Sequence, residues 1–142
     1  MQMMRAPALV RLYRMDRERR RLLLRALLVL TAASAVVAAL PFRVAIRFGA
    51  VLLKGRAARR PAECVKAIES VSRRLPWRTK CIEKGLAVQR LLRSGGVDAV
   101  LHYGARHAES GMLEAHVWVS VDGETVIGGD EVPGFAELAQ YP

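Results

Sequence analysis

Cys81 and His116 are the two residues in this sequence whose types suggest nucleophilic chemistry. A cysteine attacks a carbonyl carbon as a thiolate, so it needs a neighbouring base that takes or shares the thiol proton, and a third group that orients this base. Cys81 lies in the stretch RTKCIEKGLAVQRLLRSGG, and His116 lies further along in LEAHVWVSV. The pair therefore suggests acyl transfer or amide hydrolysis through a covalent intermediate.

The stretch 78–96 has the pattern of a helix that carries Cys81 in its first turn. Thr79 is a suitable N-cap, and Gly95 with Gly96 provides a left-handed stop. The positive end of the helix dipole favours a thiolate at this position. Three neighbouring cations favour it as well: Arg78, Lys80 and Lys84.

Helical spacing predicts that Cys81 faces the core, because it shares a stripe with Gly85, Val88 and Leu92. A glycine within a helix costs about 1 kcal/mol relative to alanine. We therefore expect Gly85, one turn after the cysteine, to let another backbone approach the sulfur closely. The alternative interpretation is a small buried cysteine that packs as a hydrophobic residue, which is what the pattern around Cys64 predicts.

His116 is the candidate base, and alternation predicts that it lies on the strand face opposite Val117, beside Trp118. A structural histidine remains the alternative, and His102 on the neighbouring strand is a further candidate for contact with a substrate. We expect Asp130 to orient the base, because a loop carboxylate after the next strand can reach back across the hairpin. Two other acids stay open for this role: Asp122, which turn chemistry explains, and Glu131.

The length of 142 residues predicts one domain with a basic N-terminal extension. Residues 1–60 hold 14 Lys and Arg against 2 acids, and residues 61–142 hold 9 against 11. The excess positive charge suggests contact with an acidic peptide, an acidic partner or an anionic membrane surface, or a solvated basic face without a partner. No nucleic-acid-binding motif is present, so no nucleic acid partner is expected.

Two cysteines do not make a disulfide framework, so the sequence is typical of a protein of a reducing compartment, and we expect it in the cytoplasm. No CxxC or HExxH motif occurs, so neither a metal nor another cofactor is expected. Residues 26–42 form a run of 17 without a charge. A core helix fits this run best, while a membrane span, an interfacial helix and a signal peptide stay open.

Hydrophobic periodicity predicts helices first and strands afterwards, which makes the fold class α+β. The division that we expect is a basic N-terminal helical region, 1–60, and a core, 61–142, joined by a linker at 54–63. We expect residues 128–142 to form a loop with one helical turn. The predicted helices are 5–15, 17–40, 43–53, 62–74 and the one within 78–96, and the predicted strands, an antiparallel meander, are 97–104, 113–121 and 124–127.

The order of a cysteine at a helix start, a histidine in AHVWVSVDG and an acid after the next strand resembles the papain-like and transglutaminase-like superfamily. Within it, CIEKGLAVQRLLRSGGVDAVLHYGA and EAHVWVSVDGETVIGG are similar to the split-type B proteins, the leader peptidases of lasso-peptide biosynthesis. The similarity covers 75–129 well and the N-terminal helices loosely. Many such proteins place an aspartate about 12 residues after the histidine, where this sequence has Gly128.

This resemblance implies a cysteine peptidase with a transglutaminase-like core, in which Cys81 is the nucleophile, His116 the base and Asp130 the third member of the triad. It also implies a substrate, the leader of a ribosomally made precursor peptide, which is removed before the macrolactam ring closes. The implied partners are a separate small leader-recognition protein and an ATP-dependent lasso cyclase. A scaffold without catalysis, and another acyl transfer such as transglutamination, are the alternatives.

Overall fold

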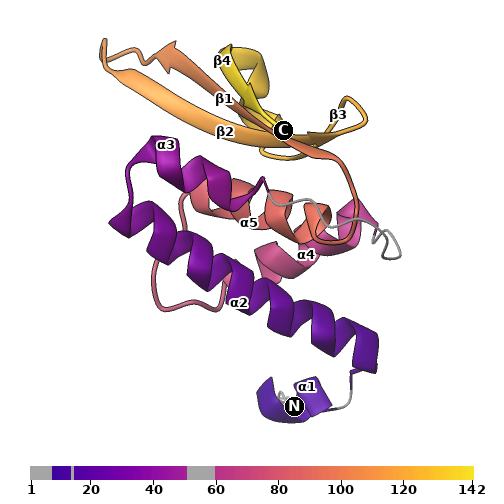
Figure 1. The fold of residues 1–142 in the computed structure, drawn as a ribbon. Helices are drawn as coiled ribbons and strands as arrows, with labels where there is room; N and C mark the ends of the chain where they lie inside the picture. Colours follow the sequence, from indigo (N-terminus) through magenta and orange to yellow (C-terminus); the bar gives the residue numbers. More distant parts are fainter. Residues whose placement is uncertain (1–7, 14, 51–59) are drawn as a thin grey trace, which may run out of the picture.

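The chain forms a layer of helices packed on one face of a four-stranded antiparallel sheet (Figure 1). This computed structural model describes residues 8–13, 15–50 and 60–142. The α+β class predicted from the sequence is confirmed. The helices are α1 Ala8–Tyr13, α2 Arg17–Ala39, α3 Phe42–Ala45, α4 Pro61–Ser72 and α5 Cys81–Arg93, with short 3-10 turns η1 Ile46–Phe48 and η2 Gly129–Gly134.

The sheet has the strand order β3-β2-β1-β4, with every neighbouring pair antiparallel. Its strands are β1 Ala99–His107, β2 Leu113–Val121, β3 Glu124–Ile127 and β4 Ala136–Tyr141. The predicted bounds of β2 and β3 are confirmed, and the turn between them, Asp122–Gly123, has positive φ at both residues, as a tight hairpin requires. The helical turn predicted within 128–142 is present as η2, but the prediction of a loop for the rest of this tail is wrong, because it adds β4 along the free edge of β1.

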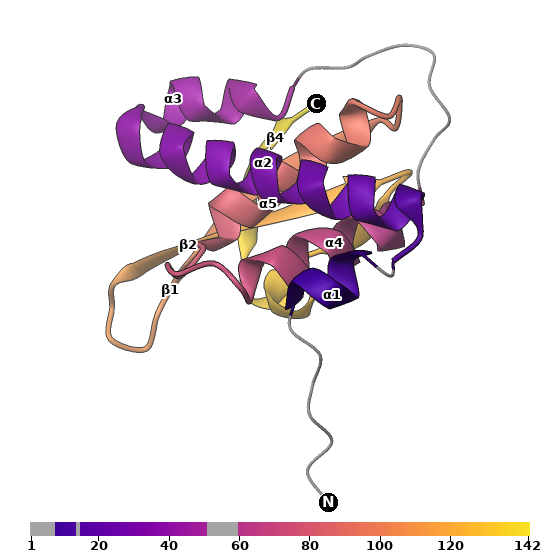
Figure 2. The ribbon, with the colours of Figure 1, turned by 90° about the horizontal axis from the view of Figure 1, so that it is seen from below.

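Helix α5 is the central element, with the sheet on one side and α2 and α4 on the other. Figure 2, seen from the helical side, shows α2 crossing in front of α5 with the sheet behind. The helix buries Leu86, Val88 and Leu92 completely, so its inward faces lie within the hydrophobic core. A site carried by α5 is therefore held from both sides.

Both ends of α5 are fixed by local hydrogen bonds. The helix starts at Cys81, after an N-cap at Lys80, whose backbone N–H donates to Glu83 Oε2 at 2.8 Å. The predicted N-cap, Thr79, instead shares a 2.6 Å hydrogen bond with the Ser72 hydroxyl. The helix ends as predicted at the glycine pair, where Gly96 has φ of 83°.

Two buried polar side chains tie the far half of α5 to the sheet. Gln89 Nε2 donates to the carbonyls of Ala99 at 3.2 Å and Tyr141 at 2.8 Å, so it joins the helix to β1 and β4. Arg93 donates to the Asp98 carboxylate at 2.8 Å, just before β1 begins. Gln89 and Arg93 are buried, so their donors depend on these acceptors, whereas the Asp98 carboxylate is 75% exposed. The bonds from the two buried side chains help to fix how α5 lies on the strands.

Helix α2 contributes Leu22, Ala26, Leu30 and Ala33 to the shared core, where it packs against α4 and α5. It is also long and apolar enough to cross a membrane, with a mean hydropathy of 2.2 over its best window, of which 17% is buried. The helix predicted at 43–53 is confirmed over 43–48, where α3 and η1 follow each other, and it ends at Phe48, earlier than predicted. Its last residues, and most of the predicted linker, lie outside the described residues.

Gly85 is required by side chains and not by a backbone, which corrects the expectation from the sequence. A Cβ at this position would lie 2.8 Å from Val117 Cγ1 and 3.1 Å from Leu101 Cδ1. The glycine therefore lets α5 settle directly on β1 and β2, and this contact sets how close the helix lies to the sheet.

We predict that Gly85→Ala lowers the free energy of unfolding by about 1–2 kcal/mol in urea titrations. The free-energy cost of the clash with Val117 should exceed the stabilisation that alanine brings over glycine within a helix. In the double variant with Val117→Ala, which removes the clashing methyl groups, the two changes should cost less than the sum of their separate effects. Strict additivity, or a more stable Gly85→Ala variant, would contradict this account of the contact.

Candidate active site

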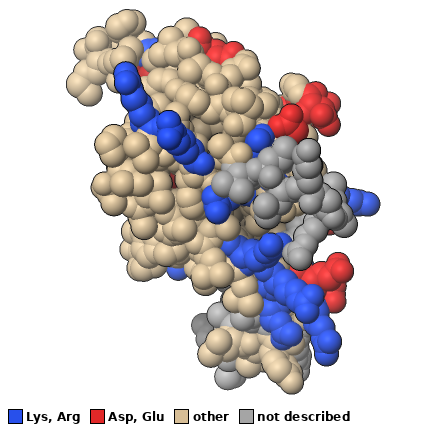
Figure 3. All heavy atoms as spheres, in the orientation of Figure 1, with Lys and Arg blue, Asp and Glu red and all other residues tan. Residues whose placement is uncertain are grey.

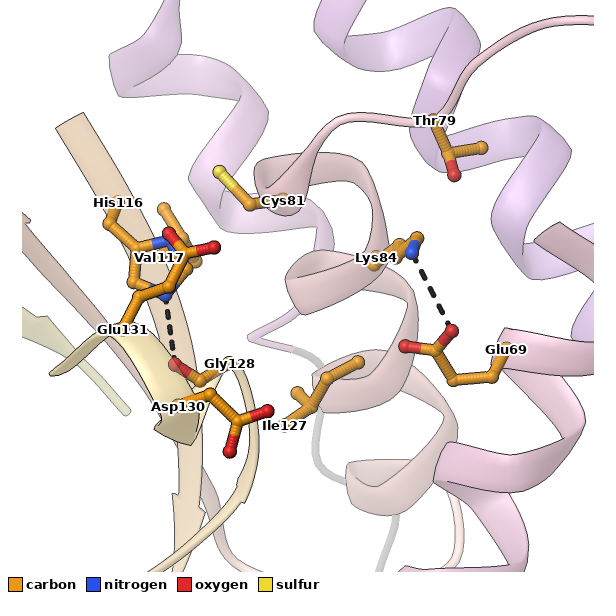
Figure 4. A pocket seen from close by; sticks show the side chains of 10 residues that line it. All are labelled: Glu69, Thr79, Cys81, Lys84, His116, Val117, Ile127, Gly128, Asp130 and Glu131. Carbon is orange, nitrogen blue, oxygen red and sulfur yellow. Dashed lines mark hydrogen bonds and ion pairs between the residues drawn. The ribbon is translucent and has the colours of Figure 1, made fainter. Parts of the chain in front are cut away.

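A pocket of about 270 Å³ opens between the first turn of α5, strand β2 and the segment that follows β3 (Figure 4). Cys81, His116 and Asp130, which the sequence singles out separately, all line this pocket. Gly128 and Glu131 line it as well. The fold therefore brings together side chains from three elements that are distant in sequence.

Cys81 is the first residue of α5, and it is exposed. The prediction that it faces the core is therefore wrong, although Gly85, Val88 and Leu92 of the same stripe are buried. The physical reason is the pocket, which occupies the space beside the first turn, so that the thiol borders a cavity instead of core atoms. In Figure 4 the sulfur points out from the helix end, on the side where His116 lies.

His116 is held in β2 by a hydrogen bond from its Nε2 to the Gly128 carbonyl oxygen at 2.9 Å. A carbonyl oxygen only accepts, so Nε2 must carry the ring proton. In the neutral ring this leaves Nδ1 with a lone pair, and Nδ1 is the nitrogen that can accept the proton of a thiol. No hydrogen bond joins His116 to Cys81, both of which the structure describes, so the thiol is unpaired with the base in this state.

Gly128 reaches the imidazole because its backbone passes very close to β2. Its φ is 80°, in the left-handed region that favours glycine. A Cβ there would lie 2.8 Å from the Val117 carbonyl oxygen and 3.0 Å from Trp118 Cβ. A side chain at this position is therefore excluded while the backbone keeps its path, and the backbone itself supplies the acceptor.

The two acids after Gly128 lie differently around the pocket. Asp130 belongs to η2, and its carboxylate points away from the imidazole in Figure 4. Among the described residues no hydrogen bond or ion pair joins Asp130 to His116. Glu131 Oε2 lies 3.5 Å from His116 Nδ1, but its side chain is 63% exposed, so solvent screening keeps this pair weak. Asp122 has φ of 51° in the β2–β3 hairpin turn and does not line the pocket.

The His116 ring is also packed against aromatic groups. The imidazole stacks on Trp118, as the alternation predicted, with ring centroids 6.1 Å apart, and contacts the Phe135 ring at 5.1 Å. Arg106 lies over Phe135 at 4.4 Å from its centroid. These contacts bury His116 to an exposed fraction of 6% and restrict how far its ring can turn.

His102, a further candidate from the sequence, does not line the pocket but lies in a polar network on the same sheet face, which the sequence did not predict. His102 stacks parallel on Trp118 at 5.4 Å, and its two nitrogens contact Ser120 Oγ at 2.7 Å and the Glu137 carboxylate. The hydrogen bond from His102 holds the pKa of the Glu137 carboxyl below its usual value. Strand alternation places His102, Trp118 and Ser120 on one face, but Glu137 lies in β4, which the sequence pattern did not predict.

The remaining wall of the pocket is charged but neutralised. Lys84, on the same helix as Cys81, forms an ion pair with Glu69 of α4 at 3.6 Å (Figure 4). Within the described part of the chain, no group of three His, Cys, Asp or Glu side chains is arranged to hold a metal ion. Of the residues that line the pocket, Cys81 and His116 are the pair that can act as nucleophile and base.

Comparison with known families agrees with this geometry, since the model of a family described as the transglutaminase-like superfamily matches residues 9–140. The chain belongs to the transglutaminase-like superfamily. The match includes α2 as well as the Cys81 helix and the sheet. No curated protein and no solved structure matches the chain.

The exposure of the two cysteines makes a direct prediction for thiol alkylation. Iodoacetamide should modify Cys81, which borders the pocket, about 100-fold or more faster than Cys64, which is completely buried in α4. Peptide mapping by mass spectrometry after a time course measures both rates. The Cys81→Ser variant should lose the rapid phase, and rapid labelling of Cys64 in the folded protein would contradict the assignment of the open thiol.

Proposed function

We propose that this protein is a cysteine peptidase that removes the leader from a ribosomally made lasso-peptide precursor before the macrolactam ring closes. The observation that carries the proposal is the hydrogen bond from His116 Nε2 to Gly128, which leaves Nδ1 as the base in the pocket of Cys81. The transglutaminase-like fold supports acyl chemistry on a thiol. The similarity of the stretches around Cys81 and His116 to split-type B proteins supports the leader peptide as substrate.

The first half of the reaction forms an acyl-enzyme. His116 Nδ1 takes the Cys81 thiol proton, and the thiolate attacks the carbonyl carbon at the end of the leader. The Cys81 backbone N–H, which has no partner within the first turn of α5, can donate to the developing oxyanion. His116 then protonates the amine of the core peptide, and the carbon–nitrogen bond breaks.

The second half of the reaction restores the enzyme. His116 removes a proton from water, the resulting hydroxide attacks the thioester carbonyl, and the leader leaves with a new carboxylate while the thiol is regenerated. The released core carries a free amine, which a lasso cyclase would then acylate with the use of ATP. A separate leader-recognition protein would hold the leader, as in the split-type systems that this sequence resembles.

In this proposal the third member of the machinery is the Gly128 carbonyl, which takes the place that Asp130 was expected to fill. It performs the task of the orienting acid, since it accepts from Nε2 and so fixes the ring tautomer. A carbonyl carries no net charge, so it stabilises the imidazolium less than a carboxylate does. Glu131, 3.5 Å from Nδ1, supplies the nearest negative charge.

The test is incubation of the full chain with a precursor peptide and its recognition protein, with the products read by mass spectrometry. We predict that Cys81→Ala abolishes cleavage, with a loss of at least about 10³-fold, while binding of the precursor persists. His116→Ala should lower the rate by about 10²–10⁴-fold. His107→Ala, at an exposed histidine of β1, is the matched control and should leave the rate unchanged.

Two further variants separate the candidate orienting groups. Gly128→Ala, which forces the carbonyl away from β2, should slow cleavage by about tenfold or more, and Asp130→Asn by less than about threefold. The reverse order would return the role to Asp130. Processing that is unchanged in Cys81→Ala would leave only a scaffold function, and a product joined to an added amine, in place of a hydrolysed leader, would assign an acyl transferase.

A further inference from the structure

Helix α2 has a second apolar face that no part of the described structure covers. Its inner residues, such as Ala26 and Leu30, are completely buried against α4 and α5. On the opposite side Leu24 is 46% and Leu28 is 70% exposed, with Leu27 beside them at 40%. Exposed large apolar residues that lie together mark interaction sites, so this outer face is a candidate docking surface.

Arginines lie on the same side of the helix as this outer face, towards the start of α2. Helical spacing of three to four residues aligns Arg17, Arg21 and Arg25 with Leu24 and Leu28, and all five residues are exposed. Figure 3 shows Lys and Arg side chains gathered over the first turns of α2. An exposed face that carries both arginines and leucines suits an anionic membrane surface, because the arginines attract the anionic headgroups while the leucines bury apolar area.

A second pocket, of about 290 Å³, lies at the edge of this face between α2 and the end of α5. It is lined by the apolar Leu28, Val29 and Leu91 together with two arginines, Arg25 and Arg90. The Arg90 guanidinium lies over the Phe48 ring, 4.5 Å from its centroid, and one of its nitrogens donates to the Phe48 carbonyl at 2.7 Å. Its other N–H groups can serve a further acceptor. Two arginines beside aliphatic side chains suit a phosphate that is attached to an acyl chain.

We propose that the outer face of α2 docks on an anionic membrane surface, with a lipid phosphate between Arg25 and Arg90 and with Leu24 and Leu28 in the acyl region. The inner face of α2 is committed to the protein core, so the helix lies on the membrane and does not cross it. An acidic peptide would match the arginines but not the leucines between them, which is why a lipid surface fits better. This docking goes beyond the peptidase reaction and does not depend on it.

The test is flotation of the full chain with vesicles of phosphatidylcholine alone, and of phosphatidylcholine mixed with phosphatidylglycerol. We expect binding to the anionic vesicles only, weakened by high salt. Leu28→Asp and the double change Arg21→Glu with Arg25→Glu should each lower binding by about tenfold or more. The matched controls are Leu138→Asp, at a leucine of β4 that is 62% exposed, and Arg73→Glu at the end of α4, and both should bind like the unchanged protein.

Four results would overturn the proposal. They are equal binding to neutral vesicles, no binding to either kind, equal losses in the Leu138→Asp control, and retained binding in Leu28→Asp. Competition by soluble polyglutamate that depends on Arg25 but not on Leu28 would assign the face to an acidic peptide instead. Precursor cleavage in solution by Leu28→Asp should equal that of the unchanged protein, which keeps this result separate from the fate of the peptidase.

Discussion

The hydrogen bond between His116 Nε2 and the Gly128 carbonyl is the interaction on which the account of the site depends. It settles which ring nitrogen carries the proton, and so which nitrogen is free to act as a base. It exists because the chain after β3 runs close enough to β2 to exclude any side chain at position 128. The same backbone path turns the following residues into η2, which brings Glu131 to the pocket and points Asp130 away from the imidazole.

The position of the thiol depends on a second constraint, the close packing of α5 on the sheet. Gly85 allows this approach, and the buried Gln89 and Arg93 hold the other half of the helix to the strands. With α5 fixed along most of its length, its first residue is placed at the pocket without needing contacts of its own. An exposed thiol can thus be positioned by a helix that is held by its cap at Lys80 and by the packing of residues further along it.

The sequence predicted much of this arrangement, because the periodic patterns were strong where the elements are half-buried. The alternation in LEAHVWVSV predicted β2 and the stacking of His116 on Trp118, and the Asp122–Gly123 pair predicted the hairpin. It did not predict β4, an edge strand whose residues are mostly exposed and so show no alternation. The exposure of Cys81 was not predicted either. Helical spacing predicts which face of α5 carries Cys81, but not how far along the helix that face is covered by other elements. A backbone acceptor such as the Gly128 carbonyl has no side-chain signature at all.

The central claim, that a backbone carbonyl fixes the tautomer of the base, is tested most directly by long-range ¹H–¹⁵N NMR of the histidine rings in the uncomplexed protein at mildly alkaline pH. The His116 signals are assigned as those lost in His116→Gln. The account predicts a ring protonated at Nε2 with an unprotonated Nδ1, in slow exchange with solvent because the ring is 6% exposed. A ring protonated at Nδ1, or one that exchanges rapidly between both tautomers, would contradict it.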